Sequence, residues 1–185
     1  MKKTVILLLT LALLAACLAG CAKSEEQQFF DQVEELTSLV ETNLPLIELI
    51  QGYEVSYIQE NNYTDDSNGS EIAAAALTIY QYGLEEAGKQ GTKTEHATIS
   101  KIDERSARID ELAKLIGNSE YGKQNAAELK EAAVGLGITY KSMTGLLYEP
   151  YGPASSFKTD FNGIKTLANH YIEVVNNRLN EQKGT

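Results

Sequence analysis

Proline, glycine and basic side chains are all scarce in this sequence. The chain of 185 residues has 3 Pro and 14 Gly, which excludes a low-complexity or collagen-like polypeptide. It has 16 basic side chains against 26 acidic ones, a formal charge of -10. Since phosphate binding needs a basic face, this balance argues against a nucleic-acid partner. The hydrophobic content of 43% is too high for a disordered chain, and the length predicts one domain.

Residues that ligate metals or act as nucleophiles are few as well. The 2 histidines, His96 and His170, lie in neither a Glu-x-x-His nor a His-Glu-x-x-His pattern, so diiron and zinc-protease sites are not expected. The sequence contains no Gly-x-Ser-x-Gly motif. His170 with Met143 can be drawn as a haem-ligand pair, but a boundary histidine bonded to a neighbour is the simpler interpretation. The sequence therefore predicts no enzyme, no cofactor and no metal site.

One acidic loop invites a calcium interpretation. Asp65 and Asp66 lie in a run of Asn, Asp, Ser and Gly, but an EF-hand aligned on its Gly would need Asp at Thr64 and Glu at Ala75. Both positions fail. A looser carboxylate site that includes Glu71 stays open as an alternative, and Asx turns in a solvated loop explain the same residues without a metal.

Residues 1–20 have the organisation of a signal peptide. Lys2 and Lys3 form a short positive region, Val5–Ala16 is almost entirely apolar, and polarity begins at Lys23. The apolar run is shorter than the roughly 20 residues that a membrane span needs. We therefore expect it to be cleaved rather than to cross the membrane.

The segment ends on Leu18–Cys21, Leu-Ala-Gly-Cys, which resembles the lipobox of bacterial lipoproteins. The resemblance covers residues 1–21 only. It implies cleavage before Cys21, attachment of lipid to its thiol and acylation, for example with palmitate, of the new amino terminus, which together make a stable membrane anchor. A second quartet, Leu14–Cys17, also fits, but Cys21 is favoured because it lies where the apolar run gives way to polar residues. A lipidated Cys21 leaves the mature chain without a cysteine pair, so the fold depends on its core.

The resemblance also implies a location. A lipid-anchored chain lies at the cell membrane or outer membrane and faces the periplasm or the extracellular side. In enteric-type bacteria an Asp after the lipidated Cys tends to retain a lipoprotein in the inner membrane; Ala22 stands there, which favours an outer membrane, and a Gram-positive surface is equally compatible. The expected division is 1–20 signal peptide, 21–23 lipidated Cys and short stem, and 24–185 a single domain.

The remaining chain has helical periodicity. Apolar residues recur every three or four positions, and almost no stretch alternates with period two. The stripes lie within Phe29–Ile47, Ile72–Ala87, Ile99–Ile116, Ala126–Leu147 and Phe157–Val175. Short connections make sequential helices antiparallel neighbours. We therefore predict an all-α fold, an up-and-down antiparallel helical bundle of about five helices.

Several small or cyclic residues are expected to shape these helices. Pro45 should kink or restart the first helix, and Gly52 is a plausible stop. Gly135 and Gly137 predict a bend or short break in the fourth helix. The second helix has a face of small residues that includes Gly83, which would let a neighbouring helix approach closely.

The 10 tyrosines are the most unusual feature of the composition. In a strictly up-and-down bundle the loop at 52–70 lies far from the anchor, and the turn at 149–153, with tyrosines on both sides of its proline, faces the membrane interface. Tyr53, Tyr57 and Tyr63 surround the distal loop. Tyrosine gives contact area at low entropy cost, so these three are a candidate partner surface. Packing at the bundle ends is the alternative for both groups.

These observations favour a non-enzymatic, lipid-anchored protein of the cell envelope. It would touch the membrane through its anchor and bind an envelope protein or a cell-wall component, or act structurally. The alternative is a sensor or carrier of a small ligand or metal in the bundle interior. Glu34, Glu41 and Glu48 line one side of the first helix at seven-residue intervals; a solvated face explains them, and attraction of a cationic partner is the alternative.

Overall fold

The computed structural model describes residues 23–61, 69–90, 101–151 and 153–183, and these residues form six helices without a strand. The helices are α2 (Glu25–Glu60), α3 (Gly69–Gln90), α5 (Ile102–Asn118), α6 (Glu120–Asn125), α7 (Ala127–Tyr148) and α8 (Ala154–Lys183). The all-α prediction is confirmed. Five of the helices are long, and the sixth, α6, is a single short element between α5 and α7.

The first helix, α2, is longer than its sequence suggested. It begins after Ser24, whose side-chain oxygen accepts a hydrogen bond from the backbone N–H of Gln27 at 3.1 Å. The helix then continues through Pro45 and Gly52 for 36 residues. Gly52 does not stop it because the buried face continues beyond, to Ile58, which has no exposed surface. Burial of this face outweighs the low helix propensity of one glycine.

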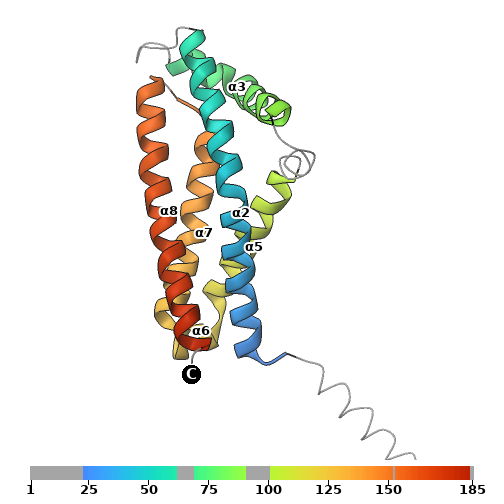
Figure 1. Ribbon diagram of the computed structural model, residues 1–185, viewed down its shortest axis with the longest axis vertical. Coiled ribbons are helices and arrows are strands. Elements are labelled where there is room, and N and C mark those ends of the chain that lie inside the picture. The colour runs from blue at the N-terminus through green and yellow to red at the C-terminus, as the bar shows by residue number, and fades with distance from the viewer. Residues whose placement is uncertain (1–22, 62–68, 91–100, 152, 184–185) are drawn as a thin grey trace, which may run out of the picture.

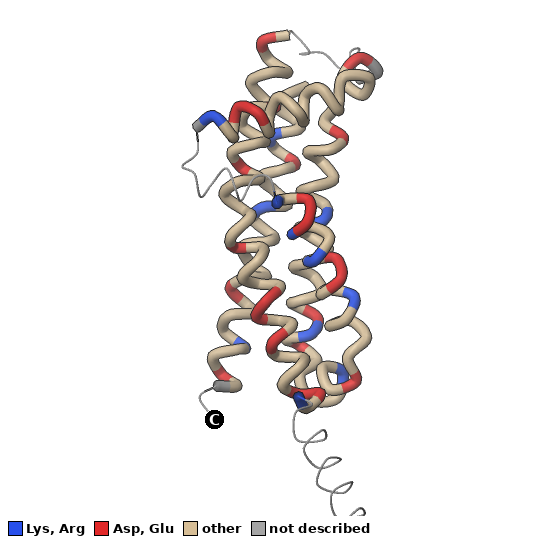
Figure 2. Tube along the Cα trace, turned by 90° about the vertical axis from the view of Figure 1, so that its right-hand side faces the viewer, with Lys and Arg blue, Asp and Glu red and all other residues tan. Residues whose placement is uncertain are grey.

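Four helices run side by side along the molecule: α2, α5, α7 and α8 (Figure 1). Along this bundle α2 and α7 point one way, and α5 and α8 point the other way. Ion pairs join the neighbouring helices: Glu35–Arg108, Glu48–Lys165, Asp110–Lys141 and Glu128–Arg178. Figure 2 shows that acidic and basic residues alternate along the outside of the bundle. These pairs are partly or largely exposed, so each adds little stability and the core holds the helices together.

The remaining long helix, α3, does not run down the bundle. It lies obliquely against the far end of α2, where Gly83 meets the side chains of Ile50 and Glu54 (Figure 1). The return along the bundle is therefore made by α5, and every later helix has the opposite direction from the one expected. The expectation that the 149–153 turn faces the anchor is wrong: α7 ends beside α3, where the Tyr148 and Tyr80 rings lie 4.7 Å apart.

Glycines bring α6 and α7 close to their neighbours. A Cβ atom added to Gly122 would lie 2.5 Å from the ring of Phe29, and one added to Gly137 would lie 2.6 Å from Ala113. Gly135 meets the ring of Tyr171 in the same way. The expected short break is absent, since α7 is one continuous helix from Ala127 to Tyr148. These glycines serve close packing between helices rather than a change of direction.

The described residues contain their own hydrophobic core. Its buried apolar side chains extend from Phe29 to Leu179 and come from the five long helices, and Tyr121 of α6 packs against them partly buried. The described helices therefore pack on one another through a shared apolar interior. None of the described helices combines the length and the apolar content needed to cross a bilayer.

The glycine contacts predict opposite effects of two alanine substitutions. Gly137→Ala should lower the free energy of unfolding by about 1–3 kcal/mol, because the new methyl group overlaps Ala113 and forces α5 away from α7. Gly52→Ala should raise it by about 0.5–1 kcal/mol, because nothing lies within 4 Å of the added carbon. Urea unfolding followed by circular dichroism measures both. Equal effects of the two variants would contradict the close approach at Gly137.

Candidate functional site

A carboxylate and two tyrosines meet where α3, α5 and α7 converge. Asp103 lies in the first turn of α5, at an N-terminus that favours negative charge. Its Oδ1 accepts hydrogen bonds from the Tyr148 hydroxyl at 2.5 Å and from the Tyr80 hydroxyl at 3.3 Å. The two tyrosine rings are 4.7 Å apart and inclined by 62°. One carboxylate oxygen thus ties three helices together, and Oδ2 takes no part in these bonds.

A second polar group lies deeper, between α2, α5 and α7. The buried Asn43 donates from Nδ2 to the Tyr140 hydroxyl at 3.0 Å, and Ser106 Oγ lies 3.0 Å from the same hydroxyl. Arg105 donates from Nη1 to Asn43 Oδ1 at 3.2 Å. Tyr140 is only 1% exposed, so this network satisfies polar groups that would otherwise be buried without partners.

The surroundings keep these phenols protonated. Burial raises the pKa of Tyr148 to about 12, and its hydrogen bond to Asp103 acts in the same direction. Burial also raises the pKa values of Tyr80 and Tyr140 above the usual tyrosine range. At neutral pH all three hydroxyls are therefore uncharged donors, and none is poised to act as a base or a nucleophile.

A cleft of about 370 Å³ opens between α5 and α7 beside both groups. The polar side chains that line it include Asp103, Ser106, Asp110, Tyr140, Lys141 and Tyr148. Lys141 Nζ lies 2.7 Å from Asp110 Oδ2, so these two charges neutralise each other. The volume lies within the range of small-molecule pockets, and most of the exposed lining is apolar.

Glu54 is the other unusual side chain in the fold. It faces α3 from α2 with no exposed surface, and neither carboxylate oxygen has a hydrogen-bond partner among the described residues. The side-chain amide nitrogen of Gln51, one turn earlier, also has no hydrogen-bond partner among the described residues. Burial raises the pKa of Glu54 to about 9, so the side chain is a neutral carboxylic acid at pH 7.

The predicted partner surface is only partly described. Tyr53 and Tyr57 lie on α2 near its far end, both are half-buried, and the Tyr57 ring packs 5.0 Å from that of Tyr82 in α3. Tyr63 lies outside the described residues, as does the predicted lipidation site, Cys21. Tyr53 and Tyr57 therefore contribute to packing between helices, and their role as a partner surface stays a prediction.

The metal and haem alternatives gain no support from the described residues. No group of three or more His, Cys, Asp or Glu side chains in the described part of the chain is arranged to hold a metal. Met143 is fully buried, whereas His170 is exposed on α8 beside Tyr171, so the two do not line one site. Asp65, Asp66 and His96 fall outside the described residues.

Sequence reasoning missed both Asp103 and Glu54. Asp103 gave no signal, because an acidic residue in the first turn of a helix is ordinary. Glu54 did give one: it lies seven residues after Ile47 and four before Ile58, on the same apolar stripe. A carboxylate at a core position of a helix is the pattern that would have identified it.

Comparison of the chain with protein-family models, curated proteins and solved structures finds no match, so its function is argued from its own residues.

Glu54 predicts that stability falls as pH rises. The folded chain keeps the proton up to about pH 9, whereas an unfolded chain loses it above the ordinary value of 4.5. Between these values unfolding releases a proton, which costs the fold about 1.4 kcal/mol per pH unit. Glu54→Gln should remove this slope and raise the free energy of unfolding at pH 8 by about 2–4 kcal/mol, which is the proton-release cost at that pH less the cost of burying an unpaired amide. Urea titrations at several pH values measure the difference, and the exposed Glu60→Gln variant should keep the wild-type slope.

The buried network predicts a cost for removing one hydroxyl. Tyr140→Phe should lower the free energy of unfolding by about 1–3 kcal/mol, because the Asn43 amide loses its partner in a buried place. Tyr121→Phe removes a hydroxyl that bonds the exposed Glu26, and should change stability by less than about 0.5 kcal/mol. Chemical denaturation compares the two. A Tyr140→Phe variant as stable as the wild type would show that the network contributes nothing.

Proposed function

We propose that the protein is a lipid-anchored, non-enzymatic binding protein of the cell envelope. It is held through Cys21 at the cell membrane or outer membrane and faces the periplasm or the extracellular side. The observation that carries the proposal is the short distance along the chain between Cys21 and the first rigid element. The helix α2 begins at Glu25, so only Ala22, Lys23 and Ser24 lie between it and Cys21 in the sequence.

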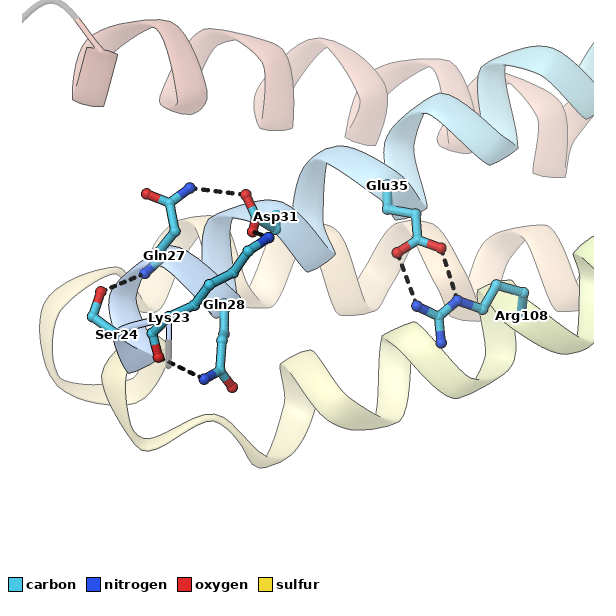
Figure 3. A network of polar contacts seen from close by, with 7 residues as sticks. All are labelled: Lys23, Ser24, Gln27, Gln28, Asp31, Glu35 and Arg108. Carbon is cyan, nitrogen blue, oxygen red and sulfur yellow. Dashed lines mark hydrogen bonds and ion pairs between the residues drawn. The ribbon is translucent and has the colours of Figure 1, made fainter. Parts of the chain in front are cut away.

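Polar contacts fix the start of α2 firmly (Figure 3). Lys23 pairs with Asp31 at 2.5 Å, and its backbone carbonyl accepts a hydrogen bond from Gln28 Nε2 at 2.8 Å. Further along, Glu35 takes two hydrogen bonds from Arg108, which tie α2 to α5. A lipid on Cys21 would therefore hold the bundle close to the membrane, with little slack for it to tumble.

This anchoring sets the height of the polar groups above the membrane. At about 1.5 Å per residue, α2 is about 54 Å long, and Asn43 lies about 27 Å from its first residue. The Asp103 cluster and α3 lie further along the bundle, on the side away from the anchor. The arrangement suits a protein that presents a binding surface to a component beyond the lipid headgroups, such as an envelope protein or a cell-wall polymer.

The chemistry of the described polar groups supports binding over catalysis. Asp103 bonds to two protonated tyrosines, and the Tyr140 hydroxyl is occupied by Asn43 and Ser106. The raised pKa values of these tyrosines keep their hydroxyls protonated, which suits hydrogen bonding to a partner better than nucleophilic attack. The cleft between α5 and α7 favours a second candidate function, the carriage or sensing of a small ligand, because its volume and its mostly apolar lining are typical of ligand pockets.

Substitution of the two cysteines tests the anchor. In cells fed radioactive palmitate, Cys21→Ser should abolish labelling and move the protein from the membrane fraction to the soluble fraction, because the acceptor thiol is gone. Cys17→Ser is the matched control and should remain labelled and membrane-bound. Labelling that survives Cys21→Ser but disappears with Cys17→Ser would place the lipid on Cys17. If neither variant is labelled, the proposal is overturned.

A further inference from the structure

The cleft between α5 and α7 is lined by one carboxylate, Asp103, that forms no ion pair among the described residues. Asp110 is neutralised by Lys141 across the same cleft, but none of the ion pairs among the described residues includes Asp103. The two hydroxyls that bond Asp103 both use Oδ1. Phenols satisfy hydrogen-bonding capacity without cancelling charge, so the carboxylate remains an anion at the edge of a mostly apolar hollow.

Two tyrosines line the cleft together with Asp103. Tyr148 and Tyr140 both line the cleft from α7. Tyr148 is held against Tyr80, and Tyr140 is held by Asn43 and Ser106, so both rings are fixed before any ligand arrives. The faces of tyrosine rings attract cations, and the attraction is strongest for cations that shed water easily. An anion next to rigid aromatic faces complements an organic cation.

We propose that this cleft binds an organic ammonium group, with Asp103 supplying the counter-charge and the exposed ring of Tyr148 contacting its alkyl substituents. The inference rests on the proposed binding function and names the ligand chemistry for it. The formal charge of -10 favours the approach of cations to the protein as a whole.

Other ligand classes fit the cleft less well. A divalent metal needs several oxygen ligands at once, and the cleft offers a single uncompensated carboxylate. An anion would meet Asp103 directly. The second large hollow, about 460 Å³ beside Tyr171 of α8, differs in charge, because Lys123, Lys130 and Glu131 line it.

The test compares choline with its neutral carbon isostere, 3,3-dimethylbutan-1-ol, by calorimetric titration of the chain from residue 22 onward. Choline should bind in a saturable way with a dissociation constant on the order of 1 mM or tighter, and the neutral isostere at least about tenfold more weakly. Equal binding of the two would overturn the proposal, because the charge would then contribute nothing.

Variants separate the roles of charge and ring. Asp103→Asn should weaken choline binding by about tenfold or more, and Glu104→Gln, which removes an exposed charge one residue along, should leave it unchanged. Tyr148→Phe keeps the ring and should retain most of the affinity, whereas Tyr148→Leu should lose it. Circular dichroism checks that each variant is folded.

The outcomes are distinguishable from those of the anchoring experiment. Absence of saturable choline binding by the folded wild-type chain, or equal losses in Asp103→Asn and Glu104→Gln, would overturn the cleft assignment. Neither result would affect the membrane anchor, which the cysteine variants test in cells. Loss of labelling in both cysteine variants, with choline binding intact, would overturn the anchor alone.

Discussion

Close approach of helices along α6 and α7 is the constraint on which the rest of the structure depends. Glycines in these two helices pack against Phe29 from α2, Ala113 from α5 and Tyr171 from α8. Neighbouring helices can approach closely because the residues at these contact positions are glycines, which have no side chain. This packing sets the distance between α5 and α7, and thereby positions Asp103 to receive the hydroxyl of Tyr148.

The helical bundle could be predicted from the sequence because each stripe repeats at the period of an α-helix. The stripe that begins at Phe29 is buried almost residue for residue, through to Ile58. The direction of the later helices could not be predicted in this way. A stripe identifies the buried face of a helix, but it does not show whether the neighbour lies along the whole length of that face or crosses it, as α3 crosses α2 at Gly83.

Less of the candidate site than of the fold could be predicted from the sequence. Tyr80 and Tyr140 are both buried with their hydroxyls bonded. Their partners could not be inferred, since Asp103 and Asn43 come from other helices and each is ordinary in its local sequence. Polar clusters of this kind form only where particular helices meet. They can therefore be identified only once the packing of the helices is known.

The docking of α3 on α2 has a consequence for how the molecule opens. Gly83 brings the α3 backbone against the side chain of Glu54, a carboxylic acid that water would hydrate well. The helix α3 therefore keeps this carboxylic acid away from water, and any opening of α3 would hydrate Glu54 at the same time as it exposes the apolar side chains that α3 buries, among them Ile72 and Ile79.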